Sequence, residues 1–298
     1  MTRVMRVSRS SRGAVSLVLS ILIVLLTATP ASAARPLPGS MSGTGDSITR
    51  AYNTCLIPYV DCPSRSWSTG SNETINSIYL RILAVKPRIS GRAYNDARSG
   101  AKMADLPGQM TTASARNVKA VTVQMGGNDV CTSSPSSMTS VEAFRASFTK
   151  AMQTISANPN VSTVYVTSVP DAYRLWELFR NDFVARTVWS LFGICQSLLA
   201  RPTSMEEADV ERRQAVRARN IAFNQVLEDV CASFEVCVFD GWAVFCTQFT
   251  TADVTARDYF HPSRSGQRKL ADVAWRAGPW VRQPTPRLGS DCLADTPA

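Results

Sequence analysis

The stretch that decides the fold is Asn117-Val118-Lys119-Ala120-Val121-Thr122-Val123-Gln124-Met125, followed by Gly126-Gly127-Asn128-Asp129. Its first part is a short run of β-branched and apolar residues, and the two glycines bound it. Such a run predicts a strand that is buried inside a sheet. The Gly-Gly-Asn-Asp block then predicts a turn directly after the strand, and by itself this is ordinary turn chemistry.

Similar runs predict four more strands, and stretches with helical spacing of apolar residues lie between them. The strands are expected at Gly39–Gly45, Arg88–Tyr94, Val161–Val169 and Glu235–Asp240, and helices at Val141–Ile155 and Ala208–Phe234. The first strand is poorly marked, because it holds few β-branched residues. Strands that alternate with helices predict parallel βαβ units, and hence an α/β sandwich with a five-stranded sheet.

Residues 171–200 are unusually rich in bulky apolar side chains. They include Leu175, Trp176, Leu178, Phe179, Phe183, Val184, Val188, Trp189, Leu191 and Phe192. One interpretation is one or two amphipathic helices that pack on the core. The alternative is a cap over the site that shapes an apolar acyl pocket.

Candidate site residues follow the predicted strands, where ligand sites form in parallel sheets. Ser47, in Gly45-Asp46-Ser47, follows the first strand, although a serine there is also typical of a turn or a helix N-cap. Gly100 follows the second strand and would let a backbone N–H approach a substrate, or be a plain loop glycine. The amide of Asn128 could donate a hydrogen bond to a developing oxyanion.

Two familiar motifs are missing around the candidate serine. The sequence has no G-x-S-x-G elbow, which argues against the usual α/β-hydrolase. Gly43-Thr44-Gly45 has Ile48 where a dinucleotide fingerprint needs its third glycine.

The chain has a single histidine, His261. A serine becomes a good nucleophile only when a base removes its proton, so a serine mechanism in this chain must use His261. Asp258 lies three residues earlier and could hold the imidazole in the tautomer that accepts this proton. On its own the pair could equally be a histidine and an aspartate in a surface loop.

The N-terminus has the pattern of a secretion signal. A basic region is followed by an apolar run from Ala14 to Leu26 and by the small-x-small site Ala31-Ser32-Ala33. The apolar run is short for a membrane span, which needs roughly 20 residues. We expect cleavage of residues 1–33, which leaves one domain at 34–298 with a Pro-rich tail at 280–298; an uncleaved membrane anchor is the alternative.

The cysteines all lie after this signal, and their even number predicts disulfides. They are Cys55, Cys62, Cys131, Cys195, Cys231, Cys237, Cys246 and Cys292. Eight cysteines allow 105 pairings, so the sequence leaves the connectivity open. Short loops favour Cys55–Cys62 and Cys231–Cys237, and Cys131–Cys195 and Cys246–Cys292 are then our guess for the others. Without a C-x-x-C motif and with one histidine, a zinc site is not expected.

Charge gives no sign of a nucleic-acid partner. Cleavage would remove Arg3, Arg6, Arg9 and Arg12 and no acid, which lowers the formal net charge from +9 to +5. The densest basic cluster, Glu211–Arg219, follows several acids, which is typical of the solvated face of a helix.

Taken together and in this order, the blocks resemble those of the SGNH hydrolase family, the GDSL-type esterases and lipases. Gly45-Asp46-Ser47 matches the serine block, with Ile48 in place of the leucine of the GDSL name. Gly100 fits the glycine block, residues 126–129 match Gly-x-Asn-Asp, and residues 258–261 match Asp-x-x-His. The chain looks most like the secreted, disulfide-bonded members of this family from actinobacteria.

The resemblance implies a flavodoxin-like, three-layer α/β/α fold with Ser47 as nucleophile, His261 as base and Asp258 as orienting acid. It also implies an oxyanion hole made by the backbone N–H groups of Ser47 and Gly100 and by the Asn128 side chain. Some secreted relatives orient the histidine with a backbone carbonyl, so this alternative to Asp258 stays open.

The predicted function is hydrolysis of carboxylic esters by a secreted serine esterase, through an acyl-enzyme. The natural substrate could be a small acyl ester, an acylated carbohydrate, or a lipid or phospholipid. A catalytically inactive binding protein that keeps the fold is the alternative outside the enzymes. We expect a monomer that needs no cofactor or metal, binds no nucleic acid and is not inserted in a membrane after cleavage.

Overall fold

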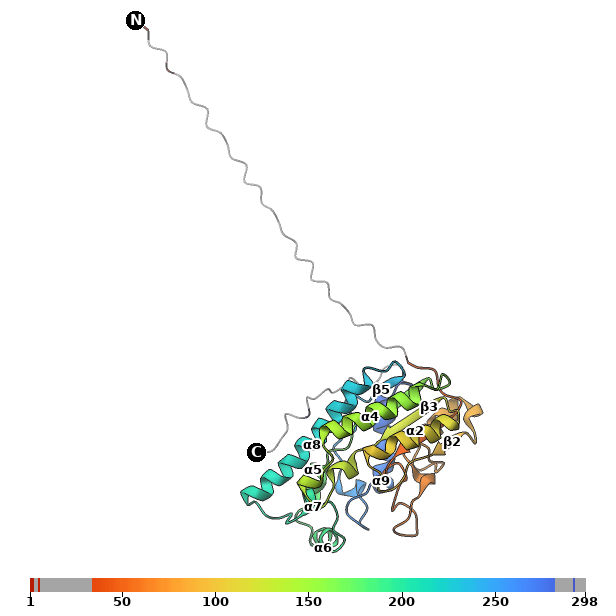
Figure 1. Cartoon of the computed structure of the whole chain (residues 1–298), viewed down its shortest axis with the longest axis vertical. Helices are drawn as coiled ribbons and strands as arrows, with labels where there is room; N and C mark the ends of the chain where they lie inside the picture. Colours follow the sequence, from red (N-terminus) through yellow and green to blue (C-terminus); the bar gives the residue numbers. More distant parts are fainter. Residues whose placement is uncertain (3–4, 6–33, 282–291, 293–298) are drawn as a thin grey trace. The chain divides into compact units, whose positions relative to one another are not determined.

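Five parallel strands form one sheet, in the spatial order β2-β1-β3-β4-β5. Figure 1 labels β2, β3 and β5 of this sheet. The computed structural model describes residues 1–2, 5, 34–281 and 292. Its strands are β1 (Met41–Gly45), β2 (Ala93–Asn95), β3 (Ala120–Gln124), β4 (Thr163–Val166) and β5 (Cys237–Phe239). This order is that of flavodoxin-like sheets. The predicted five-stranded parallel sheet is confirmed.

Two predicted segments lie largely outside the described residues. The signal peptide at 1–33 does so apart from positions 1, 2 and 5, and the Pro-rich tail does so from residue 282 on, apart from Cys292. Within the described part of the chain, no helix is long and apolar enough to cross a membrane.

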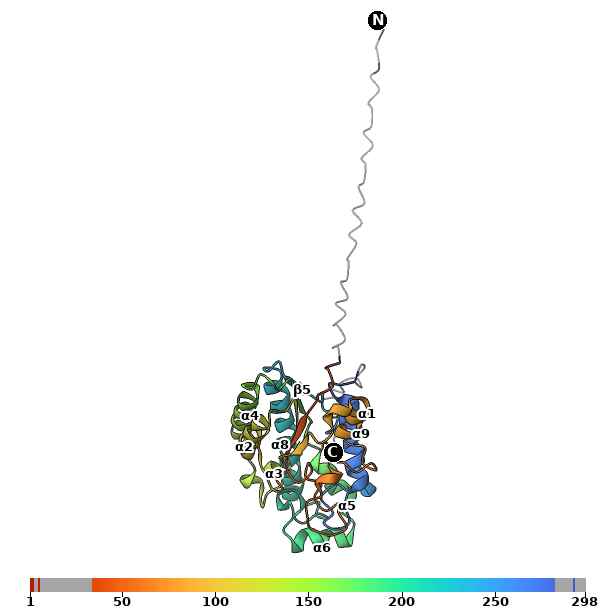
Figure 2. The same ribbon diagram turned by 90° about the vertical axis from the view of Figure 1, so that its right-hand side faces the viewer.

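Helices cover both faces of the sheet, which makes the molecule a three-layer α/β/α sandwich (Figure 2). One face carries α2 (Leu106–Ala115), α4 (Val141–Ser156) and α8 (Glu207–Cys231), and the other carries α1 (Ile78–Val85) and α9 (Arg264–Ala277). The predicted helices at 141–155 and 208–234 correspond closely to α4 and α8.

Alternation along the strands separates the two cores, because successive side chains of a strand point to opposite faces. In β3, Val121 and Val123 join the core that includes Phe144 of α4 and Phe223 of α8. The rings of these two phenylalanines stack with their centroids 3.9 Å apart. Ala120 instead belongs to the core under α1 and α9.

The poorly marked first strand, β1, lies inside the sheet and pairs with both β2 and β3. Its small and polar residues fit this place. The Thr44 hydroxyl donates to the Thr122 carbonyl at 3.0 Å, and the Ser42 hydroxyl donates to an Asp96 carboxylate oxygen at 2.7 Å. A Cβ on Gly43 would lie 3.0 Å from the Ser68 hydroxyl oxygen. Close neighbours, and not strand propensity, therefore explain the composition of β1.

The second strand begins later than the predicted start at Arg88. Pro87–Ile89 forms a 3₁₀ helix, and Gly91 turns the chain with a φ of +70° before β2 starts at Ala93. Proline favours the first turn of a helix because its φ is already fixed near the helical value. The other 3₁₀ helices lie at Pro63–Arg65, Met103–Asp105, Pro135–Ser137 and Thr251–Asp253.

The apolar segment at residues 171–200 folds into three helices, where one or two were expected. They are α5 (Ala172–Phe179), α6 (Phe183–Leu191) and α7 (Gln196–Leu199). Asp171 and Asp182 cap α5 and α6 by accepting from the backbone N–H groups of Tyr173 and Ala185 at 3.0 and 2.9 Å. These caps divide the segment, because each satisfies free N–H groups at a new helix start.

The four disulfides have the pairing favoured by the sequence. They are Cys55–Cys62, Cys131–Cys195, Cys231–Cys237 and Cys246–Cys292. Cys131–Cys195 joins the end of α3 (Gly127–Val130) to the start of α7, over 64 residues of chain. Closing a loop of this length lowers the entropy of the unfolded chain and stabilises the fold.

The basic cluster on α8 is only partly a solvated face, which corrects the prediction. Arg213 is 1% exposed and lies over the ring of Trp176, with its guanidinium carbon 4.5 Å from the ring centroid. Arg217 is also buried and pairs with Asp171 at 3.0 Å. These two arginines therefore fix α8 against α5. Periodicity alone did not reveal this, because both residues are charged.

Candidate active site

The sheet topology brings the predicted site residues to one place. Because β1 lies between β2 and β3, the turns after these three strands adjoin one another at the carboxyl edge of the sheet. Ser47, Gly100 and Asn128 lie in or just beyond these turns. The turns are linked directly, since the Arg98 backbone N–H donates to the Gly45 carbonyl at 3.1 Å.

Ser47, His261 and Asp258 form a continuous hydrogen-bonded chain. The Nε2 atom of His261 lies 2.8 Å from the Ser47 hydroxyl oxygen, and its Nδ1 atom lies 2.8 Å from Oδ2 of Asp258. When Nδ1 carries the proton and donates it to the carboxylate, Nε2 is free to accept from the hydroxyl. The structure thus puts a carboxylate oxygen, and not a backbone carbonyl, on Nδ1 of the only histidine.

Asp258 is buried but well supplied with donors. Its Oδ1 accepts from the backbone N–H groups of Phe260 and His261, both at 2.9 Å, and its Oδ2 also accepts from the Asn53 side chain. Burial raises the pKa of Asp258, but the hydrogen bonds and the positive charge from His261 outweigh it, so the net pKa is lowered. The carboxylate is therefore ionised at neutral pH.

The imidazole of His261 is also held by aromatic rings and by the backbone. The rings of Tyr52 and Phe260 have their centroids 4.9 and 5.0 Å from that of His261. The His261 carbonyl accepts from the Thr255 backbone N–H at 2.9 Å. The ring thus has little freedom to turn away from Ser47.

Three hydrogen-bond donors of the turns after β1, β2 and β3 are available for a ligand. Among the described residues, neither the Ser47 nor the Gly100 backbone N–H has a hydrogen-bond acceptor. The Asn128 amide nitrogen donates to the Ala101 carbonyl at 3.0 Å, and this bond fixes the orientation of the side chain. Since an amide nitrogen carries two hydrogens, one remains for a ligand. Gly100 has a φ of +79°, a backbone conformation that favours glycine.

The sequence of the chain matches the model of a known protein family. The model of the GDSL-like lipase/acylhydrolase family matches residues 44–274, which includes the serine, asparagine and histidine blocks. The chain belongs to this family. Membership in this family implies that the chain is an ester-hydrolysing enzyme.

Solved structures with a similar fold include acylhydrolases of different kinds. An extracellular lipase from Streptomyces rimosus is 15% identical, with a TM-score of 0.47 over 80% of this chain and 99% of that one. A family 3 carbohydrate esterase from Clostridium thermocellum is 15% identical, with a TM-score of 0.43 over 80% and 93%. No curated protein sequence matches the chain.

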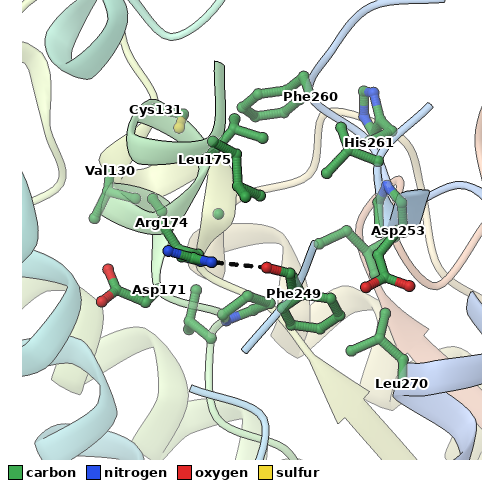
Figure 3. Close-up of a pocket in the computed structure, with 18 residues that line it drawn as sticks. Val130, Cys131, Asp171, Arg174, Leu175, Phe249, Asp253, Phe260, His261 and Leu270 are labelled. Atoms are coloured by element: carbon green, nitrogen blue, oxygen red, sulfur yellow. Dashed lines mark hydrogen bonds between the residues drawn. The ribbon is translucent and has the colours of Figure 1, made fainter. Parts of the chain in front are cut away.

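An acylhydrolase needs room for the acyl part of its ester, and an apolar pocket adjoins His261 (Figure 3). Its volume is about 110 Å³, and its lining comes mainly from α3, α5 and the segment around residues 249–262. Val130, Leu175 and Phe260 line it, and at its side the Arg174 guanidinium donates to the Phe249 carbonyl at 3.2 Å. Part of the apolar 171–200 segment therefore shapes a pocket, while Trp176 belongs to the core.

A second, wider pocket of about 370 Å³ lies on another side of His261. Asn128, Tyr52, Tyr59 and Phe192 line it, so it is more open to polar groups than the first pocket. Phe260 and His261 line both pockets. The two pockets therefore adjoin the same histidine.

Two further buried acids support the turns of the site. Asp46, next to Ser47, accepts from the Ile48 backbone N–H at 2.9 Å. Burial is the largest cause that raises the pKa of Asp46, to about 7. Asp129, next to Asn128, accepts from the Thr139 hydroxyl at 2.7 Å and from the Met103 backbone N–H at 2.9 Å, which ties the β3 turn to its neighbours.

Asn53 is a site residue that the sequence did not reveal. Its side-chain nitrogen donates to Asp258, and its side-chain oxygen accepts from the Tyr59 backbone N–H at 2.6 Å. Asn53 is buried and has a φ of +66°, which asparagine tolerates better than most residues. The one available signal was its position six residues after Ser47, in the loop that leads into Cys55.

Proposed function

We propose that this chain is a serine esterase that hydrolyses carboxylic esters through an acyl-enzyme on Ser47. His261 acts as the general base, and Asp258 orients it and stabilises its charged form. The backbone N–H groups of Ser47 and Gly100 and the side chain of Asn128 form the oxyanion hole. The observation that supports this best is the pair of 2.8 Å contacts that join Ser47 to His261 and His261 to Asp258.

The reaction proceeds in two halves. The Ser47 oxygen attacks the ester carbonyl carbon while Nε2 of His261 takes the hydroxyl proton, and the carbonyl oxygen becomes an oxyanion. When the tetrahedral intermediate collapses, the bond to the alcohol oxygen breaks and His261 returns the proton to the leaving alcohol. Water, activated by His261, then attacks the acyl-enzyme and releases the acid.

Replacing the nucleophile and the base tests this mechanism. Ser47→Ala and His261→Ala should each lower the kcat for a short nitrophenyl ester by roughly 10⁴-fold or more, because no second histidine can replace the base. An unchanged melting temperature would show that each variant is folded. Wild-type turnover by either variant would refute the mechanism.

A fluorophosphonate probe separates an esterase from an inactive binding protein with the same fold. The probe phosphonylates only an activated serine, so the wild-type chain should gain one adduct, which peptide mass spectrometry should locate at Ser47. Ser47→Ala should gain none. A wild-type chain without an adduct would favour the binding protein.

The acyl half of the ester fits the smaller pocket beside His261, because Val130, Leu175 and Leu178 line it with apolar side chains. This lining favours an acyl chain longer than acetyl. A lipid or phospholipid ester is therefore our preferred substrate class, and an acetylated carbohydrate is the alternative. A profile of kcat/KM against acyl length should rise beyond acetyl, and Leu175→Trp should shift its maximum to shorter chains by filling the pocket. Activity confined to acetyl esters would favour the carbohydrate substrate.

We further propose that the chain is exported and acts outside the cell. The four disulfides support this proposal, because disulfides persist in oxidising compartments. N-terminal sequencing of the exported protein should give Ala34-Arg35-Pro36 as its first residues. Retention of residues 1–33 would instead indicate a membrane anchor.

A further inference from the structure

Exposed apolar side chains gather on two segments of the molecule. Apart from Val85 and Met205, the exposed large apolar residues within 34–281 belong to the loop at residues 56–60 or to the region of α6. The exposed fractions are 82% for Leu56, 68% for Ile57, 73% for Phe183, 53% for Val184 and 75% for Leu191, and Tyr59, Val60 and Phe192 are exposed as well. We call this set the apolar rim. Water-soluble monomers rarely expose such a contiguous group without a binding role.

The two segments of the apolar rim meet beside the candidate active site. The rings of Tyr59 and Phe192 lie with their centroids 6.4 Å apart. Both residues line the wider pocket together with Asn128 and His261. A surface that binds the apolar rim would therefore lie beside the pocket that Asn128 and His261 line.

The loop of the rim is held in its exposed conformation by the rest of the fold. The Cys55–Cys62 disulfide closes it. The Arg257 guanidinium donates to the carbonyls of Leu56 at 2.9 Å and Ile57 at 3.2 Å, which anchors the backbone of the loop. The fold therefore fixes the backbone of this loop and still leaves Leu56 and Ile57 exposed to solvent.

Three arginines contact the backbone next to this loop, and the carboxylate of Asp61 within the disulfide-closed loop pairs with a fourth, Arg50. Arg65 and Arg264 both donate to the Thr54 carbonyl, and Arg257 donates to the carbonyl of Asn53. None of these three arginines forms an ion pair with a described carboxylate. Their mutual repulsion contributes to lowering the pKa of Arg65, after the larger effect of burial. An anionic partner would relieve this repulsion.

We propose that the apolar rim docks the protein on a lipid surface that carries anionic phosphate head groups. Large apolar side chains next to arginines are the composition of interfacial membrane-binding segments. Tyr59, Phe183 and Phe192 carry rings on which a sugar could stack, but five of the eight members are aliphatic, which favours a lipid surface over a carbohydrate. Docking would bring lipid esters to the wider pocket. This inference rests on the proposed function, since docking serves a lipid-ester substrate.

Vesicle binding by the full chain with Ser47→Ala tests docking without hydrolysis. This protein should sediment with vesicles of mixed phosphatidylglycerol and phosphatidylcholine, and less with phosphatidylcholine alone. Adding Leu56→Ser, Ile57→Ser and Val184→Ser should weaken binding to the mixed vesicles at least about tenfold, because less apolar surface is buried. Val85→Ser is the matched control: it removes an equally exposed apolar side chain at the end of α1, which lies at the opposite end of the molecule from α6 in Figure 2, and binding should not change.

The same triple substitution in the chain that keeps Ser47 separates docking from chemistry. None of its residues lines either pocket, so turnover of a soluble nitrophenyl ester should stay within about twofold of wild type. Turnover of a vesicle-bound ester should fall with the loss of binding. If the wild type hydrolyses neither ester while Ser47→Ala still binds vesicles, the proposed function fails and the docking surface stands.

Three results would overturn the docking surface. The first is no sedimentation of the Ser47→Ala chain with either vesicle. The second is binding that the triple substitution leaves unchanged or that Val85→Ser weakens equally. The third is a dimer in light scattering that the triple substitution dissociates, which would assign the apolar rim to a second copy of the chain.

Discussion

Two buried aspartates adjoin the Ser47–His261 pair, Asp46 in the sequence and Asp258 through a hydrogen bond. Their pKa values are shifted in opposite directions from the ordinary value of an aspartate. Asp258 is 6% exposed and its pKa is lowered, whereas Asp46 is 1% exposed and its pKa is raised to about 7. Burial raises the pKa of both. The hydrogen bonds make the difference: Asp258 accepts from two backbone N–H groups, an imidazole and an amide, and Asp46 accepts from the Ile48 N–H.

The fold thus gives two buried aspartates different states of ionisation at neutral pH. Donors on both oxygens stabilise the charged form of Asp258, which can then stabilise a charged His261. Asp46 has fewer donors, so burial determines its pKa, and the positive charge of His261 outweighs the negative charge of Asp129 without reversing this effect. One carboxyl is therefore ionised throughout the neutral range, and the other changes its charge within it.

The largest expected effect comes from removing the charge of Asp258. Asp258→Asn keeps the shape of the side chain but leaves no negative charge beside Nδ1 of His261, and the amide can hold the wrong imidazole tautomer. We expect kcat/KM for a nitrophenyl ester to fall roughly a thousandfold. Asp272→Asn is the control, because this side chain is 43% exposed and, within the described part of the chain, its ion pairs are with Arg81 and Arg276. A loss below about tenfold would mean that His261 is oriented by other groups.

The raised pKa of Asp46 should make the free energy of unfolding depend on pH. Its pKa is about 7 in the folded chain and near 3.8 when unfolded, so the folded state binds the proton more tightly between these values. The folded state is therefore favoured at low pH, and this contribution is lost as the pH rises through about 7. From about pH 5 to pH 8 the loss is on the order of 3 kcal/mol.

Asp46→Asn removes this titration. Relative to wild type, the variant should gain unfolding free energy as the pH rises from 5 to 8, which urea titrations at both values would measure. Part of the wild-type slope should remain in the variant, because burial also raises the pKa of Asp240, to about 6. A constant difference between variant and wild type across this range would show that Asp46 does not titrate in it.

Most of the fold could be predicted from the sequence, and three residues that the sequence proposed for the site, Ser47, His261 and Asp258, are in contact in the structure. The strand before Gly126 has a strong β-branched pattern, and His261 could be assigned because the chain has no second histidine. The acidity of Asp46 could not be predicted, because it depends on which N–H groups reach the carboxyl after folding. The inward direction of Arg213 was missed for the same reason, since its contact is the ring of Trp176 on another helix.

Asn53 allows the smallest change that tests the difference in pKa between Asp258 and Asp46. Its side chain donates a hydrogen bond to Asp258 and none to Asp46. Asn53→Ala removes the hydrogen bond to Oδ2 of Asp258, the same oxygen that faces His261. We expect about a tenfold lower kcat, since one hydrogen bond to a charged group is lost and the carboxylate is less firmly placed. The acidic limb of the kcat/KM profile should also shift to higher pH, because the loss of a hydrogen bond to its charged form raises the pKa of Asp258.

A purely structural role for Asn53 would give a different result. The loop would then loosen through the lost bond to the Tyr59 N–H, and stability would fall while the pH profile kept its shape. Asn53→Asp distinguishes the two roles further, because it keeps an acceptor for Tyr59 but puts a carboxylate where Asp258 needs a donor. Lower activity in both variants, with a shifted pH profile, would make Asn53 a positioning residue. Lower stability with an unchanged profile would make it a loop residue only.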